Sequence, residues 1–507
     1  MSERESECQH RLQTAGQRAV RLLHRRASRP LRVRCRLPVA QDQRLRRRSR
    51  CGPGLPKPAP VAPACPALTG LKSDAFAKPN GFNRVNAVAF GSLSKPVSVA
   101  ALPDLAVSIN YGPGADFKVP ENQIDVYRND GSGKFTFKAV TTGLNVISNE
   151  CGAGLGPEMV ASESAIDVGD LDGDGYRDIV YGLRTLTCSE NSGGTFVQKS
   201  VLLRAAWVRN KDAAAPGEMG APQAVAVNFV PPATTQPVTI AVRIADVDGS
   251  GTADLVLLTE LGQIDGAPKA PQLGWISNLG WDAAASKIKW ADYAVLNWPA
   301  SSGSTSKSGD AVGRAMIHAA DVNGDGLVDL MVTSRSGGGG WPGVLLHGPK
   351  GTATFTAVEL DAGFRGIGHL ADVNGDAKAD LVFQRTNNSG DLPFGQSITG
   401  LLQTATGLST SGALTLLVGD AANPVMLLGA ANFDASGSGD VLVMTFPSAK
   451  VQIRQLGCSG SAPVEVPRVS APDYAENAEY YGAVDLDGDG KLDLMFGDYE
   501  PQFISRK

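Results

Sequence analysis

The chain has 507 residues, of which 42% are hydrophobic and 19% are charged, so it can bury a core and is not globally disordered. It has no run of about 18 apolar residues, so we expect no transmembrane segment. The formal net charge of −4 divides into +11 over residues 1–50 and −15 over the remaining 457 residues.

The N-terminal segment is strongly basic. Residues 1–50 contain fifteen Arg, no Lys and four acidic residues, and a Pro/Ala-rich stretch, "KPAPVAPACPALTG", follows at 57–70. We predict that residues 1–66 form a disordered Arg-rich tail and linker. The alternative is an arm that binds nucleic acid or an anionic membrane, but fifty residues without a Lys are unusual for one. The tail has no 7–15-residue apolar stretch, so no signal peptide is recognisable in it.

Seven Cys are present, at positions 8, 35, 51, 65, 151, 188 and 458. Cys151 and Cys188 flank an Asp-rich loop, and we expect that they can pair in an oxidising compartment and leave Cys458 unpaired. There is no C-x-x-C pair, so the sequence suggests neither a zinc site nor a redox motif.

From residue 102 onward, one Asp-rich pattern recurs along the chain. It reads "DLDGDGYRDIVYG" at 170–182 and "DLDGDGKLDLMFGD" at 485–498, with relatives at 246, 321 and 372, a shortened relative at 434 and a remnant at 102–109. When the repeats are aligned on the Asp that begins the second apolar run, the steps are 74, 76, 75, 51, 60 and 53 residues. Such periodicity indicates seven copies of one supersecondary unit.

Each loop lies between two short apolar runs, which we interpret as strands because Gly and Asp bound them closely. In "IDVYRNDGSGKFTFKAV", at 124–140, the sequence predicts a hairpin that turns at "NDGSG".

Units of about four strands cannot bury both faces alone, but blades packed around an axis can. We therefore predict an all-β protein, a seven-bladed β-propeller over 67–507, with calcium loops between the first two strands of most blades. Only "FGDYEPQFISRK" follows the last loop, too little for a blade. Either residues 70–83 complete that blade, or the chain is a fragment of a longer protein.

The loops have the composition of calcium sites. Side chains at positions 1, 3 and 5, the carbonyl at 7 and the carboxylate at 9 give an all-oxygen shell, which suits Ca²⁺ better than zinc or Mg²⁺. Position 12, where an EF-hand has Glu, is Tyr181 or Phe496, which argues against that motif. The ions are expected to be structural, because clustered carboxylates repel one another unless neutralised. The predicted ligands are Asp170, Asp172, Asp174, Tyr176 and Asp178; Asp246, Asp248, Ser250, Thr252 and Asp254; Asp321, Asn323, Asp325, Leu327 and Asp329; Asp372, Asn374, Asp376, Lys378 and Asp380; and Asp485, Asp487, Asp489, Lys491 and Asp493.

The loops are not expected to bind equally well. Those at 170 and 485 have four Asp each, and Ser250 weakens the loop at 246. Ala377 stands where a left-handed Gly is expected, at a cost of about 1–2 kcal/mol. The loop at 434 reads as two residues short and is expected to be empty.

The pattern D-x-[DN]-x-[DN]-G-x-x-D between two strands, repeated sevenfold, resembles the FG-GAP/VCBS repeats of the integrin α N-terminal propeller and its bacterial relatives. "NDGSGKFTF" at 129–137 resembles the turn that commonly follows in VCBS repeats. The resemblance covers about residues 84–500. It implies several structural Ca²⁺ ions on one rim, with partners met on the opposite face or the side. It does not identify the ligand, because such propellers occur in adhesins, lectins, polysaccharide-degrading enzymes and toxins. The first blade, which lacks the first ligands, and the short sixth loop depart from the family pattern.

No catalytic motif for acyl, phosphoryl or metal-dependent chemistry is present. His318 and His369 each stand three residues before a loop. They are either ordinary strand residues, the interpretation we favour, or ligands in a central channel. Several Trp, at 275, 281, 290, 298 and 341, either pack between blades, as we expect, or stack on sugars.

We therefore expect a non-enzymatic extracellular or cell-surface propeller that mediates protein or carbohydrate binding, with no nucleic acid bound by the propeller. Two alternatives stay open: the propeller portion of a larger surface or toxin protein of the Rhs/Tc type, and an enzyme that acts on polysaccharide. Calcium loops of this simple kind need the millimolar calcium found outside cells.

Overall fold

The computed structural model consists of strands between residues 71 and 506, with no helix in the residues that it describes and therefore none able to cross a membrane. The chain divides into two compact units, Met1–Pro60 and Val61–Lys507, and every described residue belongs to the second. The described residues are 64–69, 71–75, 82–98, 101–111, 122–131, 134–141, 157–158, 165–182, 187–192, 195–200, 205–211, 218–225, 238–260, 263–264, 267–268, 272–296, 312–336, 344–347, 355–359, 364–385, 397–404, 407–409, 413–418, 425–445, 448, 450–456, 458, 463–467, 479–497 and 502–506.

The second strand of each blade begins at an Asp of the sequence repeat. This holds in all seven blades, so the alignment of the repeats is confirmed. The seven second strands are β3 (Asp104–Tyr111), β8 (Asp178–Gly182), β14 (Asp254–Glu260), β22 (Asp329–Ser336), β26 (Asp380–Arg385), β32 (Asp440–Thr445) and β36 (Asp493–Gly497).

Each second strand pairs antiparallel with a first strand before its loop and a third strand after it. The first strands are β2 (Phe82–Gly91), β7 (Ile166–Gly169), β13 (Val238–Ala245), β21 (Val312–Ala320), β25 (Phe364–Ala371), β31 (Val425–Ala431) and β35 (Glu479–Val484). The third strands are β4 (Asn122–Asn129), β11 (Ala205–Asn210), β17 (Gln272–Ile276), β23 (Val344–His347), β27 (Ser397–Leu401), β33 (Lys450–Arg454) and β37 (Gln502–Arg506). The fourth strands are β5 (Phe135–Thr141), β12 (Met219–Val225), β20 (Ala294–Val295), β24 (Thr356–Glu359), β30 (Leu414–Val418), β34 (Val464–Glu465) and, in blade 7, β1 (Leu71–Ala75).

A single bridge, between Ser334 and Gly366, joins the sheets of blades 4 and 5. In blade 1, β4 and β5 pair with Asn129 opposite Phe135, so the hairpin predicted at "NDGSG" is confirmed. Short additional strands lie outside the blade sheets. They are β6 (Pro157–Glu158), β9 (Thr187–Ser192), β10 (Thr195–Ser200), β15 (Gln263–Ile264), β16 (Ala267–Pro268), β18 (Asn278–Asp282), β19 (Lys287–Trp290), β28 (Gln403–Thr404) and β29 (Gly407–Leu408).

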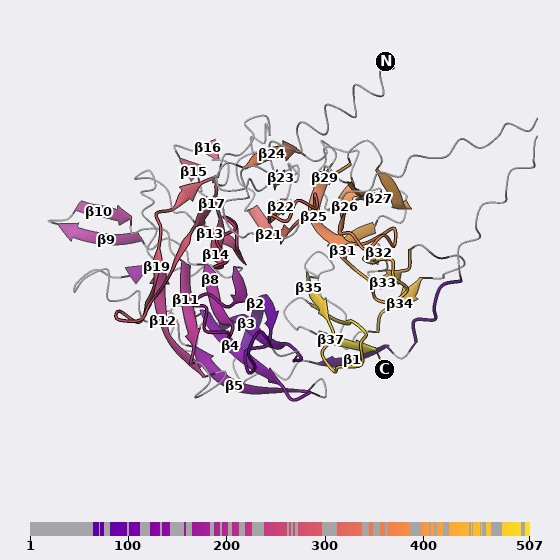
Figure 1. Ribbon diagram of the computed structural model, residues 1–507, viewed down its shortest axis with the longest axis horizontal. Helices are drawn as coiled ribbons and strands as arrows, with labels where there is room; N and C mark the ends of the chain where they lie inside the picture. The colour runs from indigo at the N-terminus through magenta and orange to yellow at the C-terminus, as the bar shows by residue number, and fades with distance from the viewer. Residues whose placement is uncertain are drawn as a thin grey trace, which may run out of the picture. The chain divides into compact units, whose positions relative to one another are not determined.

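The last blade is completed by the N-terminal end of the propeller unit. Strand β1 pairs with β37 over five residues, from Leu71 opposite Arg506 to Ala75 opposite Gln502. In Figure 1 the indigo strand β1 lies beside the yellow strand β37. The first of the two alternatives for the short C-terminal segment is therefore the correct one.

Seven buried clusters form the core, and each lies between two successive blades, including blades 7 and 1. Strand β14 is an example of an apolar strand whose side chains pack on both faces of its blade. Leu255 and Leu257 pack toward blade 2, while Val256 and Leu258 pack toward blade 4. Both faces of a blade are buried, so the second strands read as continuous apolar runs.

The first strands contact one another in the cyclic order β2, β7, β13, β21, β25, β31, β35 and back to β2. Together with the seven interblade clusters, this order shows the predicted seven-bladed propeller.

A disulfide joins Cys65 to Cys458, across 393 residues of sequence. The expectation that Cys458 stays unpaired is therefore wrong; a separation this long gives no signal in the sequence. The Pro66 carbonyl accepts a hydrogen bond from Gln455, and Leu68 is buried between blades 6 and 7. The segment before β1 is thus fastened to blade 6. The expected partner of Cys188, Cys151, lies outside the described residues.

Candidate metal centres

The loops between first and second strands share one backbone turn. We number them by blade: loop 2 (170–178), loop 3 (246–254), loop 4 (321–329), loop 5 (372–380), loop 6 (432–440) and loop 7 (485–493). Positions 4 and 6 both have positive φ, which favours Gly; in loop 2 these are Gly173 and Gly175, at 76° and 89°. The first Asp holds the turn, because Gly173 N–H donates to Asp170 Oδ1 (2.8 Å) and Gly175 N–H to Oδ2 (3.0 Å).

Two expectations about the weaker loops are resolved by this geometry. Ala377 has a φ of 63°, so the left-handed Ala predicted in loop 5 is confirmed. Loop 6, however, is not two residues short. Asn432 takes position 1 and accepts the Ser436 N–H, and Ala435 has a φ of 59° at position 4. From the sequence this loop reads as shortened because it has Asn432 at position 1 and Ala435 at position 4, where other loops have Asp and Gly.

The ninth Asp of each loop is buried and accepts hydrogen bonds from the chain. One carboxylate oxygen of Asp178 accepts the Leu171 N–H (3.1 Å), and the other accepts the Asn210 N–H at the end of the third strand (2.8 Å). Asp104 does the same in blade 1, where Ser92 and Ser94 replace the first acids. The ninth Asp therefore fixes the strands even where the loop has no other acid. The equivalent buried residues are Asp254, Asp329, Asp380, Asp440 and Asp493.

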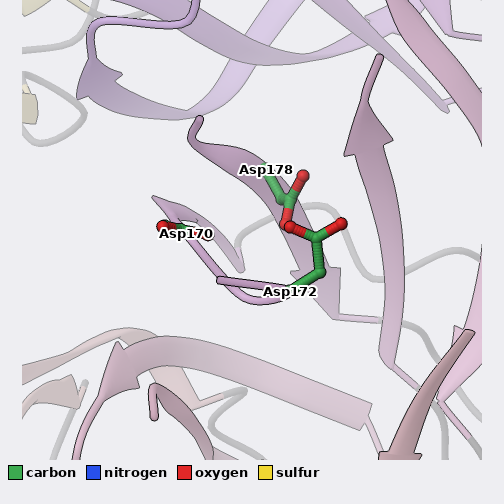
Figure 2. Close-up of side chains that lie close together, drawn as sticks. All are labelled: Asp170, Asp172 and Asp178. Carbon is green, nitrogen blue, oxygen red and sulfur yellow. The ribbon is translucent and has the colours of Figure 1, made fainter. Parts of the chain in front are cut away.

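In blades 2, 3 and 7, the acids at positions 1, 3 and 9 come together. Their ligand atoms lie within 4.8 Å of one another in each blade. Figure 2 shows this arrangement in loop 2, with Asp170 and Asp172 on the turn and Asp178 beside them. The triads are Asp170, Asp172 and Asp178; Asp246, Asp248 and Asp254; and Asp485, Asp487 and Asp493.

Loops 4 and 5 do not form such acidic triads among the described residues. Their third residue is Asn323 or Asn374, and the Asn323 side-chain amide donates to Asp325 (3.1 Å). Loop 3 does form one although Ser250 replaces its fifth acid, because position 5 is not part of the triad. The residues at position 7 lie on the turn with their N–H groups bonded to the fifth side chain. They are Tyr176, Thr252, Leu327, Lys378 and Lys491.

Loop 3 provides a test of whether a cation fits. Asp246 Oδ2 accepts the Gly251 N–H (2.9 Å), but Asp246 Oδ1 is buried without a hydrogen-bond partner. An unpaired buried carboxylate oxygen is costly unless a cation or a donor reaches it. The donor set around it consists entirely of oxygen atoms, which is the chemistry of a calcium site.

Burial disfavours the charged form of the ninth acid in several loops, and it raises the pKa of Asp380 as well as the pKa values of the three acids that follow. Burial raises the pKa of Asp178 to about 8, opposed by the Asn210 and Leu171 N–H groups and reinforced by the charge of Asp172. Burial likewise raises the pKa of Asp254 to about 6 and that of Asp440 to about 7. A positive charge in the loop would relieve this cost.

Sequence reasoning missed an Asn that links neighbouring blades. The Asn210 side-chain amide donates to the Arg177 carbonyl in its own blade (3.1 Å) and to the Leu93 carbonyl in blade 1 (2.7 Å). Asn129 makes the equivalent bonds to blade 7, and Asn278 to blade 2. The available signal was an Asn shortly after the aromatic residue of the third strand, in "YRN", "WVRN" and "WISN".

Sequence reasoning also missed Arg209, which reaches into loop 2 from the end of β11. Its Nε bonds Asp172 Oδ2, and its Nη2 lies 3.1 Å from Asp174 Oδ2. The guanidinium carbon lies 4.4 Å from the centre of the Trp281 ring, which meets Trp207 edge-on at 6.2 Å. Arg209 is thus held by two carboxylates and an aromatic face.

His318 and His369 occupy equivalent positions on β21 and β25, opposite Met331 and Val382. His318 Nε2 bonds the Gly368 carbonyl of the next blade (2.8 Å). Burial lowers the pKa of His318 to about 4 and that of His369 to about 3, so both are neutral. These contacts favour the interpretation that both are packing residues of adjacent inner strands.

Packing between blades is confirmed for the described Trp of blade 3. Trp275 is buried between blades 3 and 4, and Trp281 and Trp290 pack against the cluster between blades 2 and 3. Trp298 and Trp341 lie outside the described residues.

No family model matches the sequence, and no curated protein matches it. Among solved structures, the chain is similar to the BP39L lectin from Burkholderia pseudomallei, with a TM-score of 0.44 and 12% identity over 84% of this chain and 99% of the lectin. It is also similar to the V. cholerae biofilm matrix protein Bap1, with a TM-score of 0.25 and 10% identity over 86% of this chain and 91% of Bap1. Both scores lie below 0.5, so the fold rests on the strand pairing and the interblade clusters, and neither likeness bears on function.

Proposed function

We propose that this protein is a non-enzymatic, extracellular β-propeller of the FG-GAP/VCBS type, stabilised by calcium, that binds a protein or carbohydrate ligand. The observation that carries the proposal is the recurrence of the acid triad at one place in the blade, with an unpaired buried oxygen, Asp246 Oδ1, in one copy. Repetition at equivalent positions distinguishes these loops from ordinary Asp/Gly turns.

The triads of loops 3 and 7 are the best calcium ligands in this chain. They are Asp246, Asp248 and Asp254, and Asp485, Asp487 and Asp493. Calcium would supply the positive charge that the clustered carboxylates lack and would hold the turn in its shape. Loops 4 and 5 would bind more weakly, because Asn323 and Asn374 supply neutral oxygens.

The location of the protein outside the cell is supported by the Cys65–Cys458 disulfide, since disulfides persist in oxidising compartments. It is supported also by the calcium concentration that such loops require, about 0.1–1 mM in extracellular modules.

A binding role is supported by how the described residues are used. Among the described residues, the groups of neighbouring acids are those of the loops, and their carboxylates bind the N–H groups of the turns and strand ends. His318, which an enzyme could use in the channel, is neutral and bonded to the backbone of the next blade. Two alternatives remain as outcomes of experiment: an enzyme that acts on polysaccharide, and a portion of a larger Rhs/Tc-type protein.

The test is a count of bound calcium on the full chain by equilibrium dialysis, followed by screening the calcium-loaded protein on glycan and extracellular-protein arrays. We expect at least two ions, one lost in Asp246→Asn and one in Asp487→Asn, and binding without turnover. Polysaccharide cleavage that His318→Ala abolishes, with an unchanged melting temperature, would instead show an enzyme.

A further inference from the structure

Loop 2 differs from the other acid-triad loops in that a cation of the chain bonds one of its three triad acids, Asp172. Arg209 stands one residue before Asn210, whose N–H is fixed on the buried Asp178. The bond from Asn210 to Asp178 fixes the backbone beside Arg209. The guanidinium of Arg209 then bonds both Asp172 and Asp174. Only about a quarter of the Arg209 side chain is exposed, and that of Asp172 is fully buried.

The same third-strand position carries no charge in the other two blades with an acid triad, where it is Ser277 or Ser505. In blade 1 it is Arg128, but Ser92 and Ser94 replace the first acids of that loop. Ser277 donates to Asp248 Oδ2 in blade 3 (2.9 Å), and Gln455 donates to Asp434 Oδ2 in blade 6 (2.7 Å). In blades 5 and 7 the equivalent residues are Leu402 and Ser505. In blades 2, 3 and 6 the residue at this position therefore bonds the third residue of the loop, and in blade 2 it is Arg209.

The carboxylate oxygens of loop 2 are all engaged by the chain. Asp170 and Asp178 accept four backbone N–H groups. Asp172 and Asp174 each accept one backbone N–H and one bond from Arg209.

Loops 3 and 7 are not saturated in this way. Asp246 Oδ1 is buried and unpaired. In loop 7, the described residues provide no donor to Asp487 Oδ2, and Lys491 bonds only the exposed Asp489 (2.7 Å). An exposed pair of that kind contributes little.

We propose that Arg209 is the resident cation of loop 2, so that this loop keeps its shape without calcium and excludes the ion, while loops 3 and 7 bind it. The proposal rests on the calcium binding proposed above. It reverses the ranking given by the sequence, in which loop 2, with four Asp, is among the best sites. The guanidinium of Arg209 packs on the face of Trp281, which keeps it over the loop. Because the guanidinium is largely shielded from water, its attraction to the two carboxylates is stronger.

The experiment counts metal sites on the full-length protein. Arg209→Met removes the charge but keeps an apolar stem against Trp281, and Arg209→Lys is the matched control that keeps a positive charge. We expect calorimetric titration with Ca²⁺ to give one more site in Arg209→Met than in the wild type, and no extra site in Arg209→Lys. Tb³⁺, which occupies calcium sites and luminesces when an indole is near, should gain a signal in Arg209→Met that Trp281→Phe removes.

A second measurement does not depend on the folding of the Arg209 variants. In the wild-type background, Asp172→Asn should leave the number of calcium ions unchanged, whereas Asp487→Asn should lower it by one. Loss of one ion in Asp172→Asn would overturn the proposal for Arg209 and leave the calcium-binding function standing. A wild-type protein that binds no calcium would overturn the proposed function. In that case Arg209→Met should still bind one ion if Arg209 blocks a site. If Arg209→Met also binds no calcium, the Arg209 proposal is overturned as well.

Discussion

The side-chain amide of Asn210 in blade 2 lies 2.7 Å from the backbone carbonyl of Leu93 in blade 1, and both groups are buried. A backbone bond to Asp178 orients the same Asn. One residue therefore connects the third strand, the loop and the neighbouring blade.

Replacing Asn210 with Ala should destabilise the propeller. The change leaves the carbonyls of Leu93 and Arg177 without this donor, at a cost of about 1–3 kcal/mol for each group that stays buried and unpaired. Urea unfolding should show the loss with and without calcium. Lys211→Ala, at an exposed neighbouring site, should change the stability by less than about 0.5 kcal/mol. Equal stability of the two variants would contradict the role of Asn210.

Asp104→Asn should destabilise the protein independently of calcium. Asp104 accepts N–H groups from Leu93, Ser94 and Asn129, and an amide would turn a donor toward one of them. Hydrogen bonds to a charged acceptor contribute about 1.5–3 kcal/mol each, so a loss of that order is expected. The segment that precedes Asp104 in blade 1, residues 92–103, contains no acid, so the loss should be the same in calcium and in chelator. A loss seen only in calcium would show a metal ligand instead.

Acid should weaken the protein through His369. Burial lowers its pKa to about 3 from the usual 6.5, so below pH 6.5 the unfolded chain binds a proton that the folded chain does not. Stability must then fall as the pH falls through 6.5 toward 3, by about 2 kcal/mol between pH 7.5 and pH 5. His369→Gln cannot titrate and should lack this component. The check is the difference in urea unfolding free energy between wild type and variant at pH 7.5 and pH 5; a pH-independent difference would contradict it.

Reduction of the Cys65–Cys458 disulfide should lower the melting temperature, because the bond restricts the unfolded chain. Native disulfides contribute about 2–4 kcal/mol. Dithiothreitol should therefore lower the melting temperature of the wild type by more than that of the double variant Cys65→Ser, Cys458→Ser. Peptide mapping under non-reducing conditions should recover the two cysteines in one linked species; recovery of both as free thiols would refute the pairing.

The number of blades could be predicted from the sequence because the repeated Asp marks the start of the second strand in each blade. Asp178 and Asp254 each begin a strand, and the buried carboxylate of each accepts one N–H group from the second residue of its loop and one from the end of the third strand. Continuous apolar runs after it predicted strands buried on both faces.

What the sequence did not reveal depends on contacts between distant segments. Asn210 follows its Asp by 32 residues and Asn278 follows its own by 24, so no fixed spacing identifies the link between blades. In the sequence Arg209 resembles an ordinary surface residue. The fold shows that the end of β11 places it over loop 2. Loop 6 was misaligned because Asn432 and Ala435 replace the expected residues.

The most direct test of the central claim is thermal unfolding of the full chain in 10 mM Ca²⁺ and in excess chelator, beside the double variant Asp246→Asn, Asp485→Asn. Each site with a Kd of about 0.1–1 mM should add about 1.4–2.7 kcal/mol at that concentration. The account predicts a calcium-dependent rise in the wild-type melting temperature that is largely lost in the double variant. Equal melting temperatures of the wild type in calcium and in chelator would contradict it and leave the Asp loops as turns that need no ion.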